Sequence, residues 1–372
     1  MNQMIPRQKP QPPQKRGVAP RPPQGGKNPK ATALARALPW VLATTILLLI
    51  ISLSLLVVAL IVDGETDPDP IQPVGNSSQK EEPNTPTGSN GALYPTVPTR
   101  SDYTIENAAS YQTITELQSQ YTILLDLDSY EAVAGLNADQ RICPASMTKV
   151  MTLLVACEQV TSLTERVTVS AEAVTYQRDH GASGLAWKGG ETLSVEDLLY
   201  LIYFRSDTVA CLTVAEHLAG GEAAFVKLMN ERAEALGLKN THFTNTTGLD
   251  LDGEEYYTTC RDMATIMAYA LDNPLASKIM NQTGSWYLPD GSPAETIRPT
   301  WVTDRFGGNA KLDTVTIRAA KTGWESEPGA CLVSYAVSES GKRYINVIVG
   351  GGGLSATAST ADVKRIYRTY AD

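Results

Sequence analysis

The chain has 372 residues, enough for one large domain or two ordinary ones, and its apolar fraction of 42% is ordinary for a globular protein. Its formal net charge is −9, and its five cysteines are odd in number and have no C-x-x-C spacing. These features argue against a zinc-binding domain and a disulfide framework, although one oxidised pair stays open among Cys143, Cys157, Cys211, Cys260 and Cys331.

The chain begins with a basic arm and an apolar run. Residues 1–37 carry eight Lys or Arg and no Asp or Glu, so the rest of the chain holds a net charge of −17. Eight prolines in the first 30 residues predict disorder in this arm. Residues 38–62 form an uncharged run of 25 residues, which is long enough at about 1.5 Å per residue to span the bilayer core. This run predicts a transmembrane helix. The alternative is a cleaved signal peptide, whose apolar region would be about 7 to 15 residues long.

The charge asymmetry around this helix predicts its orientation. The positive-inside rule keeps the basic arm in the cytoplasm and places everything after residue 62 outside. A basic arm can also indicate nucleic-acid binding, but beside a membrane helix topology and contact with anionic lipid explain it more simply. We therefore expect a single-pass membrane protein with an extracytoplasmic body and no nucleic-acid partner.

Residues 63–102 are rich in Pro, Gly, Ser and acid and lack a repeating apolar face, which predicts a disordered linker. The folded domain is expected over residues 103–372. Its first predicted element is a hairpin over residues 121–137, with apolar residues on both sides of an Asp-Ser turn. Residues 146–160, "SMTKVMTLLVACEQV", are apolar on nearly every side and predict a helix buried inside the domain.

The centre of the domain is predicted to be mainly helical. A helix over residues 194–204 opens with Ser194 and Asp197 in capping-box spacing, and a helix over 209–221 ends on a glycine pair. A third, over 222–238, places four apolar residues on one side: Phe225, Leu228, Met229 and Leu236.

The end of the chain changes from helical to strand-like periodicity. Three strands are predicted over residues 314–323, 330–337 and 343–351, the last two joined in an antiparallel hairpin. A closing helix is expected to be capped by Ser359 and Asp362 and to carry one apolar face, formed by Val363, Ile366, Tyr367 and Tyr370. This order predicts an α+β fold in which the first hairpin is free to join the later sheet.

The segment "PASMTK" places Ser146 three residues before Lys149 at the start of a predicted helix. Residues i and i+3 share a helix face, so the amine can stand over the hydroxyl. A serine becomes nucleophilic when a base takes its proton, and a buried lysine can serve as that base if its pKa falls. By itself the pattern fits a helix cap equally well.

A second motif, "AAKTGW", ends a predicted strand about 170 residues later. Its Lys321 and Thr322 can bind a carboxylate, while Gly323 has no side chain to block the approach of another segment. S-x-x-K at a helix start followed by K-T-G at a strand end is far more specific than either motif alone.

With both motifs the chain resembles the serine penicillin-binding D-alanyl-D-alanine carboxypeptidases of low molecular weight, which are relatives of the serine β-lactamases. The resemblance covers roughly residues 121–352. It rests on "NADQRICPASMTKVMT", "LKNTHFTNTTGLD", "YYTTCRDMA" and "AAKTGW" followed by "GACLVSYA". It implies a β-lactamase/transpeptidase-like fold, with an antiparallel sheet flanked by helices and a mainly helical lobe. Many relatives carry a further β-rich domain, which is not expected here because the chain ends soon after its last helix.

The resemblance also implies the roles of the motif residues. Ser146 would be the nucleophile and Lys149 its general base. Lys321, Thr322 and Gly323 would line the strand that holds the terminal carboxylate of the substrate. The oxyanion hole would consist of the backbone N–H groups of Ser146 and Trp324.

The middle motif departs from the family. Where the family has S-x-N, this chain reads Ser206-Asp207-Thr208. Ser206 can still relay a proton between Lys149 and the leaving amine, but Thr208 offers a hydroxyl to the lysine and substrate in place of an amide. This departure puts rate and substrate preference in doubt more than reaction class. From the residues alone, this segment fits a helix cap at Ser206 or Asp207.

The resulting expectation is a serine D-Ala-D-Ala carboxypeptidase anchored in the bacterial cell membrane. It would trim peptidoglycan stem peptides through an acyl-enzyme, with β-lactams as covalent inhibitors. No cofactor or metal is expected, since His180, His217 and His242 lack the H-E-x-x-H spacing of a metallopeptidase. One alternative is a catalytically weak wall-binding or β-lactam-sensing protein. A β-lactamase is a further alternative, but the E-x-x-L-N loop of its fast-deacylating class is missing between Ser206 and Lys321.

Overall fold

The structure, a computed structural model, describes residues 93, 111–251, 255–308, 310–350 and 355–371. The predicted arm 1–37, the membrane helix 38–62 and, apart from residue 93, the linker 63–102 lie outside the described residues and stay predictions. In the described part, no single helix is long and apolar enough to cross a membrane. By length and composition alone, the bent pair α5 (Thr208–Ala219) and α6 (Glu222–Ala235) passes that test together.

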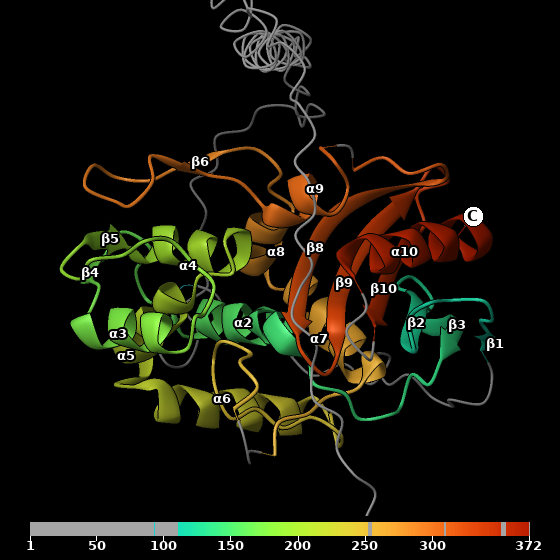
Figure 1. Cartoon of the computed structure of the whole chain (residues 1–372), viewed down its shortest axis with the longest axis horizontal. Helices are drawn as coiled ribbons and strands as arrows, with labels where there is room; N and C mark the ends of the chain where they lie inside the picture. Colours follow the sequence, from blue (N-terminus) through green and yellow to red (C-terminus); the bar gives the residue numbers. More distant parts are fainter. Residues whose placement is uncertain (1–92, 94–110, 252–254, 309, 351–354, 372) are drawn as a thin grey trace, which may run out of the picture. The chain divides into compact units, whose positions relative to one another are not determined.

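A six-stranded sheet forms one side of the domain, in the order β1-β3-β2-β10-β9-β8 (Figure 1). The predicted hairpin joins the later strands, because β2 pairs with β10 and places Ile123 opposite Val347. The pairs are antiparallel apart from β1 with β3, and β8 lies at the edge of the sheet. The strands are β1 Gln112–Thr113, β2 Tyr121–Asp126, β3 Glu131–Leu136, β8 Val315–Glu325, β9 Gly329–Ser338 and β10 Arg343–Val349.

The two faces of the sheet bury two different cores. Along β10, Ile345 and Val347 belong to the large core shared with the helical lobe, whereas Tyr344 and Ile348 belong to a smaller core beneath the last helix. This alternation follows from the two-residue period of a strand. The helix α7 (Cys260–Asp272) packs against the first face and α10 (Ala356–Tyr370) against the second.

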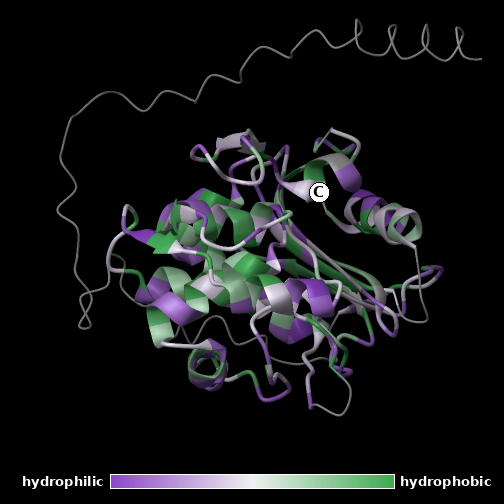
Figure 2. Ribbon diagram, turned by 60° about the vertical axis from the view of Figure 1, so that its left-hand side comes forward, coloured by the Kyte–Doolittle hydropathy of each residue, from purple (hydrophilic) through white to green (hydrophobic). Residues whose placement is uncertain are grey.

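The helical lobe beside the sheet contains α2–α6 and α8. Its helix α4 begins with the predicted capping box between Ser194 and Asp197, and α5 ends at Gly220, whose φ of 80° suits glycine. Figure 2 shows apolar ribbon concentrated in the interior of the lobe. The remaining elements are η2 Ala145–Thr148, α2 Lys149–Gln159, α3 Ala171–Asp179, α4 Val195–Phe204, α8 Pro274–Met280, α9 Thr300–Asp304, and the short strand pairs β4 Arg166–Thr168 with β5 Thr192–Ser194 and β6 Trp286–Tyr287 with β7 Thr296–Ile297.

The predicted cap of the closing helix is wrong by one turn. The Ser355 hydroxyl caps α10 by accepting a hydrogen bond from the backbone N–H of Ala358, and Ser359 lies inside the helix. Asp362 instead accepts hydrogen bonds from the backbone N–H and hydroxyl of Ser119, ahead of β2. A tertiary contact therefore explains this acidic residue, which local sequence patterns assign to a cap.

The predicted apolar faces of α6 and α10 are correct. Phe225, Met229 and Leu236 are buried, and Leu228 packs against the large core. In α10, Val363, Ile366 and Tyr367 are buried and Tyr370 packs at the margin of the smaller core.

All five cysteines lie within the described residues and are free, so the structure contains no oxidised pair.

Candidate active site

Ser146 lies on the 3-10 turn η2, immediately before α2. In a 3-10 turn, side chains three residues apart are eclipsed, which brings Lys149 directly over Ser146. The turn begins at Ala145 with φ of 48°, a left-handed conformation that its surroundings must hold in place. Tyr256 does so in part, because its hydroxyl donates to the Ala145 carbonyl over 3.1 Å and also hydrogen-bonds Thr148.

The Lys149 amine is buried and points at the serine. Its Nζ donates to Ser146 Oγ over 3.2 Å and to the carbonyl oxygen of Thr247 over 2.5 Å. Burial lowers the pKa of Lys149, and the acidic groups of Cys211, Asp207 and Glu325 oppose this shift. The shift is in the direction of the neutral amine, which is the form that can accept the serine proton.

The turn "TNTTGLD" shapes this part of the site, a role that sequence reasoning missed. The Asn245 side-chain oxygen accepts backbone N–H groups from Thr247 at 3.1 Å and from Gly248 at 2.7 Å. Gly248 has φ of 82°, and a Cβ there would lie 2.0 Å from the Ala145 carbonyl oxygen. The motif was visible in the sequence, but its contact with the serine turn is a tertiary feature.

The K-T-G segment lies on β8, against the serine turn (Figure 1). A Cβ on Gly323 would lie 3.1 Å from the backbone nitrogen of Ser146, so the glycine permits the close approach that its position predicts. Trp324 follows directly. The two backbone N–H groups expected to form the oxyanion hole therefore come from segments in contact.

Lys321 is turned inward, away from the open part of the cleft. Its Nζ donates to Ser206 Oγ over 3.0 Å and to the Thr322 carbonyl over 2.8 Å. Burial lowers the pKa of Lys321 well below its ordinary value, and the nearby charge of Lys149 lowers it further. Lys321 therefore links the strand to the middle motif.

The middle motif forms the turn between α4 and α5. Ser206 has φ of 54°, which is uncommon for a residue other than glycine, and Asp207 caps α5 by accepting from the backbone N–H of Ala210. Thr208 is buried, its backbone N–H donates to the Ser183 carbonyl, and its hydroxyl has no hydrogen-bond partner among the described residues. A buried hydroxyl without a partner is uncommon in a folded protein, and this one belongs to a residue beside the cleft.

These residues surround one cleft of about 850 Å³. Sequence reasoning missed four charged residues that line it, namely Arg205, Asp304, Arg305 and Glu325. Arg305 donates to the Ala356 carbonyl over 3.1 Å and supplies a permanent positive charge, whereas Glu325 supplies a carboxylate at the end of β8. The predicted residues that line the cleft are Ser146, Lys149, Ser206, Thr208, Thr322, Gly323 and Trp324.

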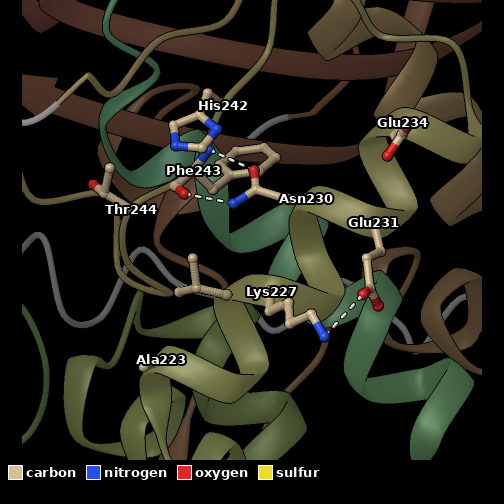
Figure 3. A pocket seen from close by; sticks show the side chains of 9 residues that line it. Ala223, Lys227, Asn230, Glu231, Glu234, His242, Phe243 and Thr244 are labelled. Atoms are coloured by element: carbon tan, nitrogen blue, oxygen red, sulfur yellow. Dashed lines mark hydrogen bonds and ion pairs between the residues drawn. The ribbon is translucent and has the colours of Figure 1, made fainter.

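A second hollow, of about 530 Å³, lies on α6 (Figure 3). Three of its polar side chains are engaged locally: the Asn230 side chain donates to the Phe243 carbonyl and accepts from the Phe243 N–H, and Lys227 pairs with Glu231. None of the predicted site residues lines it. The chemistry therefore belongs to the first cleft.

Comparisons with known proteins agree with this geometry. The family model described as D-alanyl-D-alanine carboxypeptidase, peptidase S11, matches residues 106–353. The D-alanyl-D-alanine carboxypeptidase DacA of Escherichia coli (strain K12) is 32% identical over 246 residues, 64% of this chain and 57% of that protein. DacF of Bacillus subtilis (strain 168) is 29% identical over 236 residues, 63% of this chain and 57% of that protein. The chain thus spans little more than half the length of these relatives.

Solved structures show the same fold. Penicillin-binding protein 5 from Haemophilus influenzae matches with a TM-score of 0.59 and 28% identity, covering 68% of this chain and 71% of that one. A mutant of the Streptomyces K15 DD-transpeptidase matches in fold with a TM-score of 0.61 at 24% identity, covering 68% and 98%. The predicted fold class is confirmed, and the chain belongs to the D-alanyl-D-alanine carboxypeptidase family.

Proposed function

We propose that the protein is a serine D,D-carboxypeptidase that removes the terminal D-alanine from peptidoglycan stem peptides. The observation that carries the proposal is the buried Lys149 amine, 3.2 Å from the Ser146 hydroxyl in the cleft beside the edge strand β8. Family membership supports the same activity. We further propose that the predicted helix 38–62 anchors this domain outside the membrane.

The first half of the reaction forms an acyl-enzyme. Ser146 Oγ attacks the carbonyl carbon of the penultimate D-alanine while Lys149 Nζ accepts the hydroxyl proton. The N–H groups of Ser146 and Trp324 stabilise the oxyanion. The amide C–N bond then breaks, the leaving nitrogen takes a proton through Ser206, and free D-alanine departs. Water hydrolyses the remaining ester and restores the serine hydroxyl.

The substrate peptide binds along the edge of β8. An extended chain can pair with the free edge of a sheet through main-chain hydrogen bonds, which leads the scissile bond along Thr322 and Gly323 to Ser146. Arg305 supplies positive charge for the terminal carboxylate. Lys321 acts from behind the cleft wall, through its hydrogen bond to Ser206.

Labelling with fluorescent penicillin tests the proposal on the full chain. We expect a stable adduct on Ser146, none on a Ser146→Ala variant, and release of D-alanine from a pentapeptide ending in D-Ala-D-Ala. Failure of Ser146 to be acylated would overturn the enzyme assignment. Rapid hydrolysis of the penicillin would identify a β-lactamase instead.

Thr208 favours a second candidate function, a penicillin-binding protein with weak turnover. Acylation without D-alanine release would support a wall-binding or sensing role, or a preference for endopeptidase or transpeptidase chemistry.

A Thr208→Asn variant tests whether the altered middle motif limits the rate. Because the amide adds a donor and a second hydrogen-bonding atom at the cleft wall, we expect kcat/KM for D-alanine release to rise, by roughly tenfold if one hydrogen bond is gained in the transition state. Steady-state kinetics of D-alanine release from the pentapeptide measures this. An unchanged or lower kcat/KM would show that threonine does not limit the reaction.

A further inference from the structure

We propose that Asp207, the middle residue of the Ser206–Thr208 turn, is a positioning residue: its buried carboxylate ties the loop 181–187 to this turn and thereby fixes Ser206 and one wall of the cleft. The inference rests on the proposed function. It adds a residue that sequence patterns mark only as a helix cap.

The Asp207 carboxylate joins two segments of the chain, the loop 181–187 and the first turn of α5. It is fully buried, and it accepts hydrogen bonds from the backbone N–H of Leu185 at 2.7 Å and of Ala210 at 2.9 Å. The indole N–H of Trp187 points at both carboxylate oxygens, at 3.1 and 3.0 Å. All of these partners are donors, so the site requires an acceptor on both sides, which an amide in the same place does not provide.

The loop in turn holds the backbone on both sides of Asp207. The Ser183 hydroxyl donates to the Ser206 carbonyl at 2.6 Å, and the Ser183 carbonyl accepts from the Thr208 N–H at 2.9 Å. These bonds stabilise the left-handed conformation of Ser206, which costs free energy unless its surroundings enforce it. The Ser206 hydroxyl is the group that accepts from Lys321.

The fit between the loop and Asp207 is tight. A Cβ on Gly184, whose φ is 145°, would lie 2.8 Å from Asp207 Oδ2 and 2.4 Å from the Gln177 side-chain nitrogen. Residues 180–184 line the cleft beside Ser146. A displacement of the loop from Asp207 therefore changes the shape of the substrate site directly.

Asp207 also acts on Lys149 through its charge. The titratable groups that face Lys149 are Asp207 and Cys211 from the α5 side and Glu325 and Lys321 from β8. Burial raises the pKa of Asp207, while its hydrogen bonds to Leu185, Ala210 and Trp187 oppose that rise. An ionised Asp207 stabilises the ammonium form of Lys149, so removing the charge lowers the pKa of the amine.

The test uses the full chain and the second-order rate constant for acylation by penicillin, measured across pH. For Asp207→Asn we expect a loss of at least about tenfold, because small displacements of catalytic groups are costly. We also expect the acid limb of the profile to move to lower pH, since the general base loses an opposite charge. A merely structural role moves the thermal midpoint but not the acid limb.

Asp197→Asn is the matched control. Asp197 is also a buried carboxylate at a helix start that accepts an indole N–H, from Trp286 at 2.9 Å, but it does not line the cleft. We expect this variant to lose stability and keep the acylation rate and pH profile of the wild type. Equal behaviour of the two variants would overturn the proposal.

Two further variants keep the charge and test the loop alone. Trp187→Phe removes one donor and Gly184→Ala presses the loop away from Asp207, so both are expected to slow acylation without moving the acid limb. These two variants test the proposal even if Asp207→Asn does not fold. Acylation at the wild-type rate in both of them would contradict it. A wild type that is not acylated would instead overturn the proposed function itself.

Discussion

Replacing Lys149 with alanine is expected to reduce acylation of Ser146 by roughly a thousandfold or more, because the serine loses the base that takes its proton. Lys149→Arg is expected to restore little, since a guanidinium stays protonated and cannot act as a base. Stopped-flow or gel-based acylation with fluorescent penicillin measures both variants. The fall in acylation rate can be attributed to the missing amine, because the buried Nζ of Lys149 contacts Ser146 Oγ directly at 3.2 Å.

The acylation rate of the wild type is expected to depend on pH through the protonation of Lys149. Only the neutral amine accepts a proton, so acylation rises as pH increases through the pKa of Lys149, which burial places below its ordinary value. Lys227→Ala is a suitable control, because this lysine is exposed and its ion pair with Glu231 lies on the surface, away from the cleft. Near wild-type acylation in Lys149→Ala would contradict the assignment of the base.

Substituting Gly248 with alanine is expected to disrupt the site although it removes no side chain that takes part in the reaction. The added Cβ would meet the Ala145 carbonyl oxygen at 2.0 Å and the Ser146 backbone nitrogen at 2.9 Å, so the serine turn must move. We expect acylation to fall by about a hundredfold or more, as displacements of about 1 Å can cost that much. We also expect unfolding at lower temperature, through overpacking of about 1–3 kcal/mol or more.

Gly237→Ala separates the clash from backbone strain. Gly237 has φ of 74°, close to that of Gly248, but a Cβ there would meet nothing within 4 Å. This control is expected to lose only the stability associated with a left-handed alanine, about 1–2 kcal/mol, and to keep its acylation rate. If the two glycine variants had the same acylation rate, the contact between residue 248 and the serine turn would not matter.

Local periodicity was sufficient to predict the α+β order, because it depends on neighbours in the chain. The pair Ser146 and Lys149 was assigned only together with the distant K-T-G motif and the family resemblance, since S-x-x-K alone fits a helix cap equally well. The sequence did not reveal that Thr247 accepts from Lys149 or that Arg305 lines the cleft, because those contacts join segments about 100 or more residues apart. Lys321 was predicted on the correct strand. Its inward turn to Ser206 depends on how β8 packs against the helical lobe.

The same distinction explains the error at the closing helix. Ser355 and Ser359 are both plausible caps by pattern, and the choice between them depends on Asp362 contacting Ser119, which is 243 residues away. Gly323, by contrast, was predicted correctly from the absence of a side chain alone. That prediction, that another segment approaches closely at Gly323, did not depend on knowing that the segment is the one carrying Ser146.

The edge position of β8 has a consequence for selectivity. Main-chain hydrogen bonds use groups that every peptide possesses. Pairing with β8 therefore selects for an extended substrate backbone of sufficient length and depends little on the identity of the substrate side chains. Under the proposed function, discrimination between wall peptides then falls to the few side chains around the bond, among them the exposed Trp324 and the carboxylate of Glu325. Variation at these two positions would retune substrate choice while leaving the reaction itself intact.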